Sequence, residues 1–204
     1  MRTALLLIDV QKVYTTPGSP LLVEGHEAAI ANMNRLVRAA VAAGDKLIYV
    51  RHSHRKDGSD AGRMFDYLGA PGEIGFVEGS EDVDFDPRLA LEPGALHLTK
   101  SRYSAFVGTG LHEVLQRERI GRIVVTGFMT NYCCETTARH GHDLDYYVDF
   151  VIDATGCPDA SLEIKQPLIK AVTSAVLSGG FARVVTTDDY LGDVRALRSE
   201  SIEN

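Results

Sequence analysis

Short apolar runs alternate with segments of helical periodicity along most of the chain. Apolar runs of strand length fall at residues 4–8, 46–50, 122–127, 146–153 and 182–187, with a weaker one at 95–99. Helical periodicity falls at residues 26–43, 109–118, 131–142 and 160–178. The first three strong runs are continuous rather than alternating, which is typical of strands covered on both faces. The pattern predicts an α/β fold: a doubly wound, mostly parallel six-stranded sheet with helices on both faces.

The length and composition fit one globular unit. A chain of 204 residues can bury a sizeable core, and we expect a single domain over residues 1–204. The hydrophobic content of 45% and the charged content of 24% are those of an ordinary ordered protein. Residues 53–93 form the longest stretch without clear periodicity, and a loop of that length is usually functional or mobile.

Charge and cysteine content narrow the class of partner. The net charge of -7 and the lack of Lys/Arg blocks argue against binding to nucleic acid or to anionic lipid. The first apolar run meets Asp9 before a signal core can form, and no run approaches the roughly 20 residues that span a bilayer. Three cysteines, two of them adjacent, do not suit a disulfide framework. We expect a cytoplasmic protein that acts on a small molecule.

The turn after the first apolar run carries a carboxylate instead of a phosphate cradle. It reads "DVQKVYTTPGSP", with neither G-x-G-x-x-G nor G-x-x-x-x-G-K-[ST], so a dinucleotide or nucleoside triphosphate is disfavoured. Asp9 and Gln11 follow the run directly. In open α/β sheets, ligands bind beyond the carboxyl ends of the strands, where these side chains are expected.

Two adjacent cysteines follow the run at 122–127, in "VVTGFMTNYCCETTAR". A helix is expected to begin there, with Thr130 or Asn131 as its N-cap and Cys133 in its first turn. Unpaired backbone N–H groups and the helix dipole favour a thiolate at such a position, with a pKa below the usual value of about 8.5. Cys134 lies about 100° further round the helix and is expected to face the core.

A thiolate nucleophile needs a proton carrier, a stabilising charge and donors for the oxyanion. Asp9 can carry the proton, and an acidic residue directly after an apolar run is costly to bury without a partner. Lys100 follows the weak run and can stabilise both anions. The backbone N–H groups of Met129 and Cys133 can form the oxyanion hole.

These residues carry a family resemblance. The stretches "LLLIDVQ", "KSRYSAF", "GFMTNYCCETTAR" and "VIDAT" together span residues 4–155. In them the sequence resembles the isochorismatase-like cysteine hydrolases, which include nicotinamidases and N-carbamoylsarcosine amidases. The resemblance implies a catalytic triad of Asp9, Lys100 and Cys133, and a cis peptide bond between Phe128 and Met129. It also implies a homo-oligomer.

The resemblance implies a cysteine hydrolase that cleaves a small amide or carbamoyl C–N bond through a thioester, releasing ammonia or an amine. Substrate contacts are expected from Gln11, Tyr103, Phe106 and Thr130, and pocket walls from residues 53–93. Two alternatives stay open: an isochorismatase-type vinyl ether hydrolase, which Cys133 argues against, and a catalytically silent binding protein on the same fold.

The histidines raise the question of a metal. His52 and His54, at i and i+2 on a strand, point to the same face and can share a metal ion. The nicotinamidase branch of the resembled family binds a metal from this region with an Asp-x-His pair and further histidines. Here His52 replaces the aspartate and no third histidine follows before His97, so we expect no metal and no cofactor. Substrate contact or a simple surface position stays open for His52 and His54. His140 and His142 are expected to be structural.

Overall fold

A computed structural model describes residues 1–66, 68–69 and 72–202 of the chain. Its sheet is built from β1 (Arg2–Ile8), β2 (Lys46–His52), β3 (Leu96–Lys100), β4 (Ile120–Phe128), β5 (Tyr147–Gly156) and β6 (Arg183–Val185). These six strands lie in the order β3-β2-β1-β4-β5-β6, and every neighbouring pair is parallel. The α/β fold and the sheet predicted from the apolar runs are therefore confirmed.

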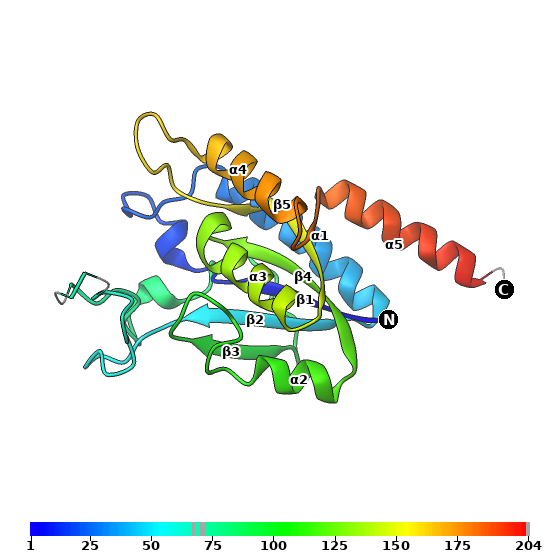
Figure 1. Cartoon of the computed structure of the whole chain (residues 1–204), viewed down its shortest axis with the longest axis horizontal. Coiled ribbons are helices and arrows are strands. Elements are labelled where there is room, and N and C mark those ends of the chain that lie inside the picture. Colours follow the sequence, from blue (N-terminus) through cyan, green and yellow to red (C-terminus); the bar gives the residue numbers. More distant parts are fainter. Residues whose placement is uncertain (67, 70–71, 203–204) are drawn as a thin grey trace.

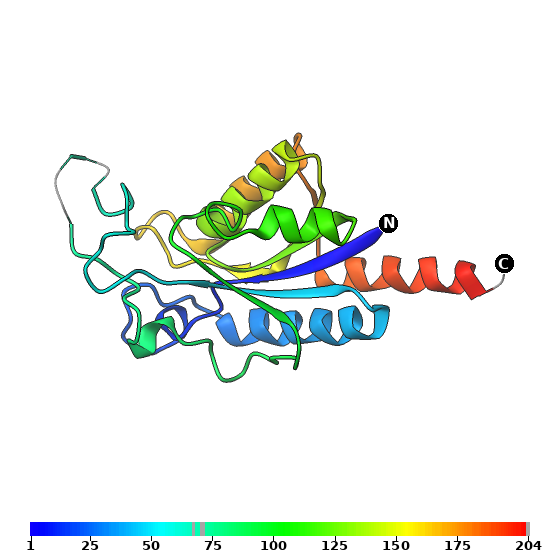
Figure 2. The ribbon, with the colours of Figure 1, turned by 90° about the horizontal axis from the view of Figure 1, so that it is seen from below.

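Helices cover both faces of the sheet. They are α1 (His26–Ala43), α2 (Leu111–Arg117), α3 (Glu135–Asp143), α4 (Gln166–Ser178) and α5 (Thr187–Ile202). Shorter turns are η1 (Lys12–Tyr14), η2 (Glu81–Val83) and the π-helical turn η3 (Thr130–Cys134). Figures 1 and 2 show α1 and α5 on one face and α2, α3 and α4 on the other. None of the described helices is long and apolar enough to cross a membrane.

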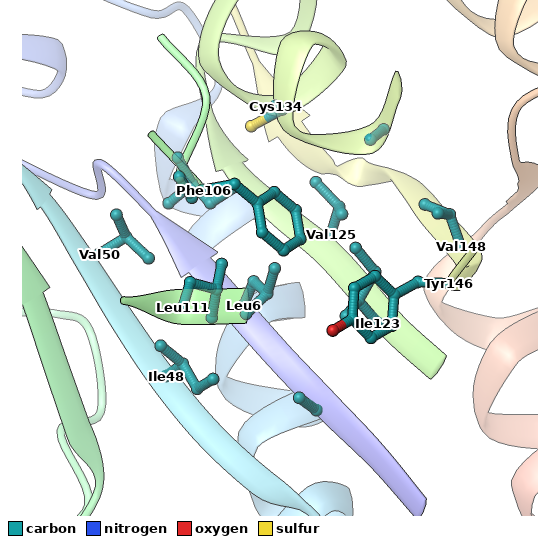
Figure 3. Packing of buried hydrophobic residues seen from close by; sticks show 14 of the residues in the cluster. Leu6, Ile48, Val50, Phe106, Leu111, Ile123, Val125, Cys134, Tyr146 and Val148 are labelled. Carbon is teal, nitrogen blue, oxygen red and sulfur yellow. The ribbon is translucent and has the colours of Figure 1, made fainter. Parts of the chain in front are cut away.

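The sheet separates two apolar cores because successive side chains of a strand point to opposite faces. Along β1, Leu6 and Ile8 enter the core under α2, α3 and α4, whereas Leu5 and Leu7 enter the core under α1. All four are nearly inaccessible to solvent. Figure 3 shows part of the first core, which also contains Phe106 and Cys134. Burial on both faces explains why the apolar runs are continuous.

The strand order creates a crevice at one end of the sheet. The chain moves outward from β1 through β2 to β3 and then returns to place β4 on the other side of β1. The crevice between β1 and β4, beyond their carboxyl ends, is the switch point at which ligands bind in open α/β sheets. Gly127 lets the two strands approach there: its φ is +114°, and a Cβ would lie 1.9 Å from the Ile8 carbonyl oxygen.

Several boundaries differ from the sequence predictions. The expected helix at 160–178 begins only at Gln166, next to Pro167, and the backbone N–H of Gln166 donates to Asp159. The helix expected at 131–142 is divided into η3 and α3. Helix α5 was not predicted, because its many polar residues leave little helical periodicity. Residues 53–93 contain η2 and turns, as their lack of periodicity predicts; positions 67, 70 and 71 lie outside the described residues.

Candidate active site

Asp9 stands at the carboxyl end of β1, in the crevice. Its backbone adopts a positive φ of 51°, and its N–H donates to the Val50 carbonyl at 2.8 Å. The side chain is completely buried. A hydrogen bond with the thiol of Cys133 acts to lower the pKa of the carboxyl. The charge of the carboxylate is met by one cation.

That cation is Lys100, the last residue of β3. Its Nζ lies 2.8 Å from Oδ2 of Asp9, and both side chains are fully buried. The same Nζ lies 3.2 Å from Sγ of Cys133 and 3.0 Å from the Arg102 carbonyl oxygen. The structure therefore brings Asp9, Lys100 and Cys133 together, although they lie at or after the ends of three different strands.

Cys133 lies in η3 and not in the first turn of an α-helix as expected. The π-helical turn follows the cis peptide bond between Phe128 and Met129. Within it, the backbone N–H groups of Tyr132 and Cys134 donate to the Met129 carbonyl, each at 3.2 Å. Cys133 is thus held between them with its side chain turned inward, only 2% exposed.

Burial corrects the expectation that Cys133 has a lowered pKa. Desolvation raises the pKa of its thiol to about 12, and the nearby Lys100 offsets only part of that rise. Burial also raises the pKa of Asp9 above its ordinary value, against the opposing effect of Lys100. Burial lowers the pKa of Lys100, but Asp9 and Cys133 outweigh it, so its pKa is raised. At neutral pH the cluster therefore holds the ammonium of Lys100 beside a neutral thiol, that of Cys133.

The charges of the cluster favour one kind of activation. Ionising Cys133 by loss of its proton to water would leave a net negative charge in a buried site, which is costly. Passing that proton to Asp9 leaves the total charge unchanged, because one carboxylate is replaced by one thiolate beside the same ammonium. The arrangement is suited to proton transfer within the cluster.

The second cysteine has a different environment. Cys134 is fully buried in the core, where its thiol donates to the Thr126 carbonyl at 3.7 Å. Burial raises its pKa well above the ordinary value. The predicted packing role of Cys134 is confirmed.

The four expected substrate contacts differ in their surroundings. Both amide N–H groups of Gln11 donate to backbone carbonyls, those of His52 and Val83, at 2.9 Å each. The buried hydroxyl of Thr130 donates to that of Thr155 at 2.9 Å. Substrate contact by these two residues stays a prediction, and it competes with existing hydrogen bonds.

The other two expected contacts, Tyr103 and Phe106, also differ from each other in their surroundings. Phe106 is buried in the core, with its ring 5.2 Å from that of His140 and 5.9 Å from that of Tyr146, so its position favours packing over substrate contact. Tyr103 is 39% exposed, and its ring lies 5.5 Å from that of Tyr132. Of the four, Tyr103 presents the most side-chain surface to an incoming molecule.

Three potential metal donors surround the Lys100 ammonium. Among the described residues, Asp9, His52 and Cys133 each bring one donor atom to within 4.8 Å of the other two. The ammonium of Lys100 already lies among them, 3.4 Å from Nδ1 of His52. A second cation in the same space would be repelled, so these residues do not suit a metal ion.

The histidine pair is also a poor fit. Nε2 of His52 and Nε2 of His54 lie 2.9 Å apart, a hydrogen-bonding distance. Two nitrogens bound to one zinc ion at 2.0–2.1 Å in a tetrahedral arrangement lie roughly 3.3 Å apart. His97 stacks on Tyr49 at 5.1 Å between ring centroids and belongs to an exposed part of β3. The expectation of no metal stays a prediction.

Sequence reasoning missed three residues around the site. Tyr14 is almost fully buried, its ring lies 5.8 Å from that of Phe128, which precedes Met129, and burial raises the pKa of its hydroxyl well above the ordinary value. Arg102 accepts a hydrogen bond from Lys100 through its backbone carbonyl and donates one to the backbone carbonyl of Asp60. Asp60 lies in the non-periodic stretch, where only the length of the loop was a signal.

A large open pocket lies away from Asp9, Lys100 and Cys133. Its volume is about 1300 Å³, and its lining includes Arg122, Asp149 and Arg183 near the amino ends of the strands. Asp149 is paired with both arginines, at 2.8 and 2.7 Å. Asp9, Lys100 and Cys133 do not line it.

Comparisons with known proteins agree with the geometry. The model of the isochorismatase domain family matches residues 3–189. A cysteine hydrolase from Pseudomonas syringae pv. phaseolicola 1448A is 32% identical, with 96% of this chain and 93% of that chain covered and a TM-score of 0.86. An isochorismatase family protein from Desulfovibrio vulgaris subsp. vulgaris str. Hildenborough is 29% identical, with 95% and 98% covered and a TM-score of 0.82. An isochorismatase-like hydrolase from Alkaliphilus metalliredigens is 26% identical, with 95% and 99% covered and a TM-score of 0.79.

Proposed function

The chain belongs to the isochorismatase family, and from this we propose that it is a cysteine hydrolase that cleaves a small amide or carbamoyl C–N bond. One observation carries the proposal. The ammonium of Lys100 lies within 2.8 Å of a carboxylate, that of Asp9, and within 3.2 Å of a thiol, that of Cys133, with all three groups buried. This combination supplies a nucleophile, a proton carrier and a fixed positive charge.

In the proposed reaction, Asp9 takes the proton of the Cys133 thiol as sulfur attacks the substrate carbonyl carbon. The oxyanion is stabilised by the backbone N–H groups of Met129 and Cys133. The C–N bond then breaks, and the leaving nitrogen takes the proton from Asp9, which leaves a thioester on Cys133. Water attacks the thioester and gives a proton to Asp9; sulfur leaves and recovers that proton, which restores the starting cluster.

The resting protonation state supports this sequence. Because the buried thiol is neutral, nucleophilic attack needs a base, and the carboxyl group of Asp9 is hydrogen-bonded to that thiol. Because burial raises the pKa of Asp9, its carboxyl is a better acceptor and later a competent acid at neutral pH. Lys100 stays charged throughout and offsets the negative charge that moves between the other two groups.

The test is a screen of small primary amides and carbamoyl compounds for ammonia release, with Cys133→Ala as the inactive reference. Acid quenching during turnover, followed by mass spectrometry, should show an acyl group on the peptide that contains Cys133. Hydrolysis of a vinyl ether with no acyl adduct would support the isochorismatase alternative instead. Specific binding of small amides without turnover would support the silent binding protein.

A further inference from the structure

A row of buried polar side chains leads from Lys100 to the edge of the site. Nδ1 of His52 lies 3.4 Å from Nζ of Lys100. Nε2 of His52 lies 2.9 Å from Nε2 of His54, and Nδ1 of His54 lies 3.4 Å from Oδ1 of Asp60. Both histidines are 1% exposed, whereas the Asp60 side chain is 26% exposed. The row thus joins a fully buried ammonium to a carboxylate that reaches solvent.

The two ends of the row dictate where its protons lie. An ammonium only donates hydrogen bonds, and an ionised carboxylate only accepts them. His52 must therefore present a bare Nδ1 to Lys100 and donate from Nε2 to His54. His54 in turn must present a bare Nε2 and donate from Nδ1 to Asp60. The opposite tautomer of His52 would set two donors against each other.

Both rings must be neutral for this arrangement. Burial and, after it, the charge of Lys100 lower the pKa of His52 to about 2. Burial also lowers the pKa of His54, although Asp60 acts in the other direction. The positively charged neighbours of the pair are Lys100 and Arg102, so protonating either ring would add a like charge nearby.

Aromatic neighbours hold the rings of the row in their planes. His52 stacks on Phe76 with centroids 4.5 Å apart and an interplanar angle of 7°. The edge of His54 meets Phe65 at 5.3 Å. The backbone N–H of His54 donates to the Phe76 carbonyl at 2.7 Å. Rotation of the two imidazole rings is therefore hindered, so the ring nitrogens stay in place for hydrogen bonding to their neighbours.

A second set of hydrogen bonds, through Arg102, also links Lys100 to Asp60. Nη1 of Arg102 donates to the backbone carbonyl of Asp60 at 2.5 Å, and the backbone carbonyl of Arg102 accepts from Nζ of Lys100 at 3.0 Å. The side-chain row and the Arg102 route form a closed circuit of hydrogen bonds. Asp60 also accepts from the N–H of Arg55 at 3.0 Å, which ties the circuit to the loop after β2.

We propose that His52, His54 and Asp60 form a polarised hydrogen-bonded row that positions the Lys100 ammonium between Asp9 and Cys133. His52 and His54 are then positioning residues, and Asp60 is the anchor that selects their tautomers. The loop that carries Asp60 is thereby coupled to the reactive cluster. This inference rests on the proposed function in taking Lys100 and Cys133 as the reacting pair.

The tautomers can be measured directly. Two-bond 1H–15N spectra of the full-length labelled protein distinguish a protonated ring nitrogen from a bare one, and His52→Asn and His54→Asn assign the two signals. We expect a proton on Nε2 of His52 and on Nδ1 of His54, unchanged over about pH 6 to 9. A proton on Nδ1 of His52, an imidazolium ring, or a metal-bound nitrogen would overturn the proposal.

The effect on the reactive cluster is measured by alkylation of Cys133 with iodoacetamide, followed by mass spectrometry of the intact chain and its peptides. Asp60→Ala removes the anchor from a partly exposed position, so the protein should fold. Loss of one charge-assisted hydrogen bond predicts alkylation about tenfold slower. Asp57→Ala is the matched control, because it removes the same charge from the same loop, where Asp57 accepts from the N–H of Ser59.

Two substitutions at His52 separate positioning from packing. The side-chain oxygen of His52→Asn can replace Nδ1 and still face Lys100, whereas His52→Gln places its amide near the position of Nε2. We expect the asparagine variant to alkylate faster than the glutamine variant. Equal rates in these two variants, or in Asp60→Ala and Asp57→Ala, would refute the proposal. Both readouts work without a substrate, so a wild-type protein that alkylates at Cys133 but hydrolyses no amide would refute only the proposed reaction.

Discussion

The ammonium of Lys100 lies 2.8 Å from the carboxylate of Asp9, and neither side chain is reached by solvent. A buried ion pair of this kind is not strong support for stability, since desolvation offsets much of the attraction between the charges. Removing one partner, however, leaves an unpaired buried charge and is strongly destabilising. The pair is best understood through Cys133, which shares the same ammonium and can exchange a proton with Asp9.

The two adjacent cysteines should respond differently to substitution. Cys133→Ala removes the nucleophile and should lower turnover about a millionfold, equivalent to roughly 8 kcal/mol of barrier. Cys134→Ala removes a packing group from the core and should keep most of the activity at a lower melting temperature. Ammonia release and thermal unfolding are measured for both variants. Equal loss of activity in the two would contradict the assignment of Cys133 as the nucleophile.

Lys100 should control the reactivity of Cys133. In Lys100→Met the hydrocarbon stem is nearly retained, but the positive charge beside Asp9 and Cys133 is lost. The thiolate then lacks its cation in a buried site, so Cys133 alkylation should slow by at least about a hundredfold at neutral pH. Lys46→Met, which breaks an ion pair with Glu118 at the sheet's other end, is the control. An unchanged rate in Lys100→Met would remove Lys100 from the mechanism.

The sequence predicted those parts of the site that depend on local pattern. Asp9 follows a continuous apolar run, so its place at the end of a buried strand was evident. The side chain of Cys134 was placed in the core by its angular offset from Cys133. Lys100 was different, because a lysine after a weak strand is usually solvated and only the family resemblance singled it out.

The remaining features depend on contacts distant in sequence. The raised pKa of Cys133 follows from complete burial, which a helix-start argument cannot foresee. The link from Asp60 to Lys100 arises because a non-periodic loop folds back on the ends of β2 and β3. The packing of Phe106 in the core also depends on distant contacts, and substrate contact by this residue stays a prediction.

Chelation should not reduce the proposed hydrolase activity. The donors of Asp9, His52 and Cys133 already surround the Lys100 ammonium, so activity should not need a metal ion. Prolonged dialysis against EDTA is followed by assays of ammonia release and Cys133 alkylation, with metal content measured before and after. Loss of activity that one particular divalent ion restores would contradict this prediction.

Gly127→Ala should destabilise the fold at the crevice. A methyl group there would lie 1.9 Å from the Ile8 carbonyl oxygen, and a φ of +114° is strained for any residue with a Cβ. The clash can be relieved only by separating β1 from β4, so we expect a loss of about 3 kcal/mol or more in the free energy of unfolding. Gly180→Ala, with no heavy atom within 4 Å of the added Cβ, is the control. Chemical denaturation of both variants measures the difference.

The pH dependence of Cys133 alkylation should reveal proton transfer within the cluster. At pH values below its pKa of about 8.5, an ordinary thiol reacts about tenfold faster for each unit by which the pH rises. Here the thiol pKa is about 12, so reaction near neutral pH proceeds through the minor form in which Asp9 holds the proton. Proton transfer from Cys133 to Asp9 releases no proton to water, so the alkylation rate should be nearly constant around neutral pH. The rate should fall in acid as Asp9 becomes protonated, at a pH above the ordinary aspartate pKa of 3.8, because burial raises the pKa of Asp9.

Asp9→Asn removes the internal proton acceptor, so alkylation of Cys133 should become slow and its rate should rise steadily with pH. A wild-type rate that rose tenfold per pH unit through neutrality would show that Cys133 loses its proton to solvent, and Asp9 would then not be its base.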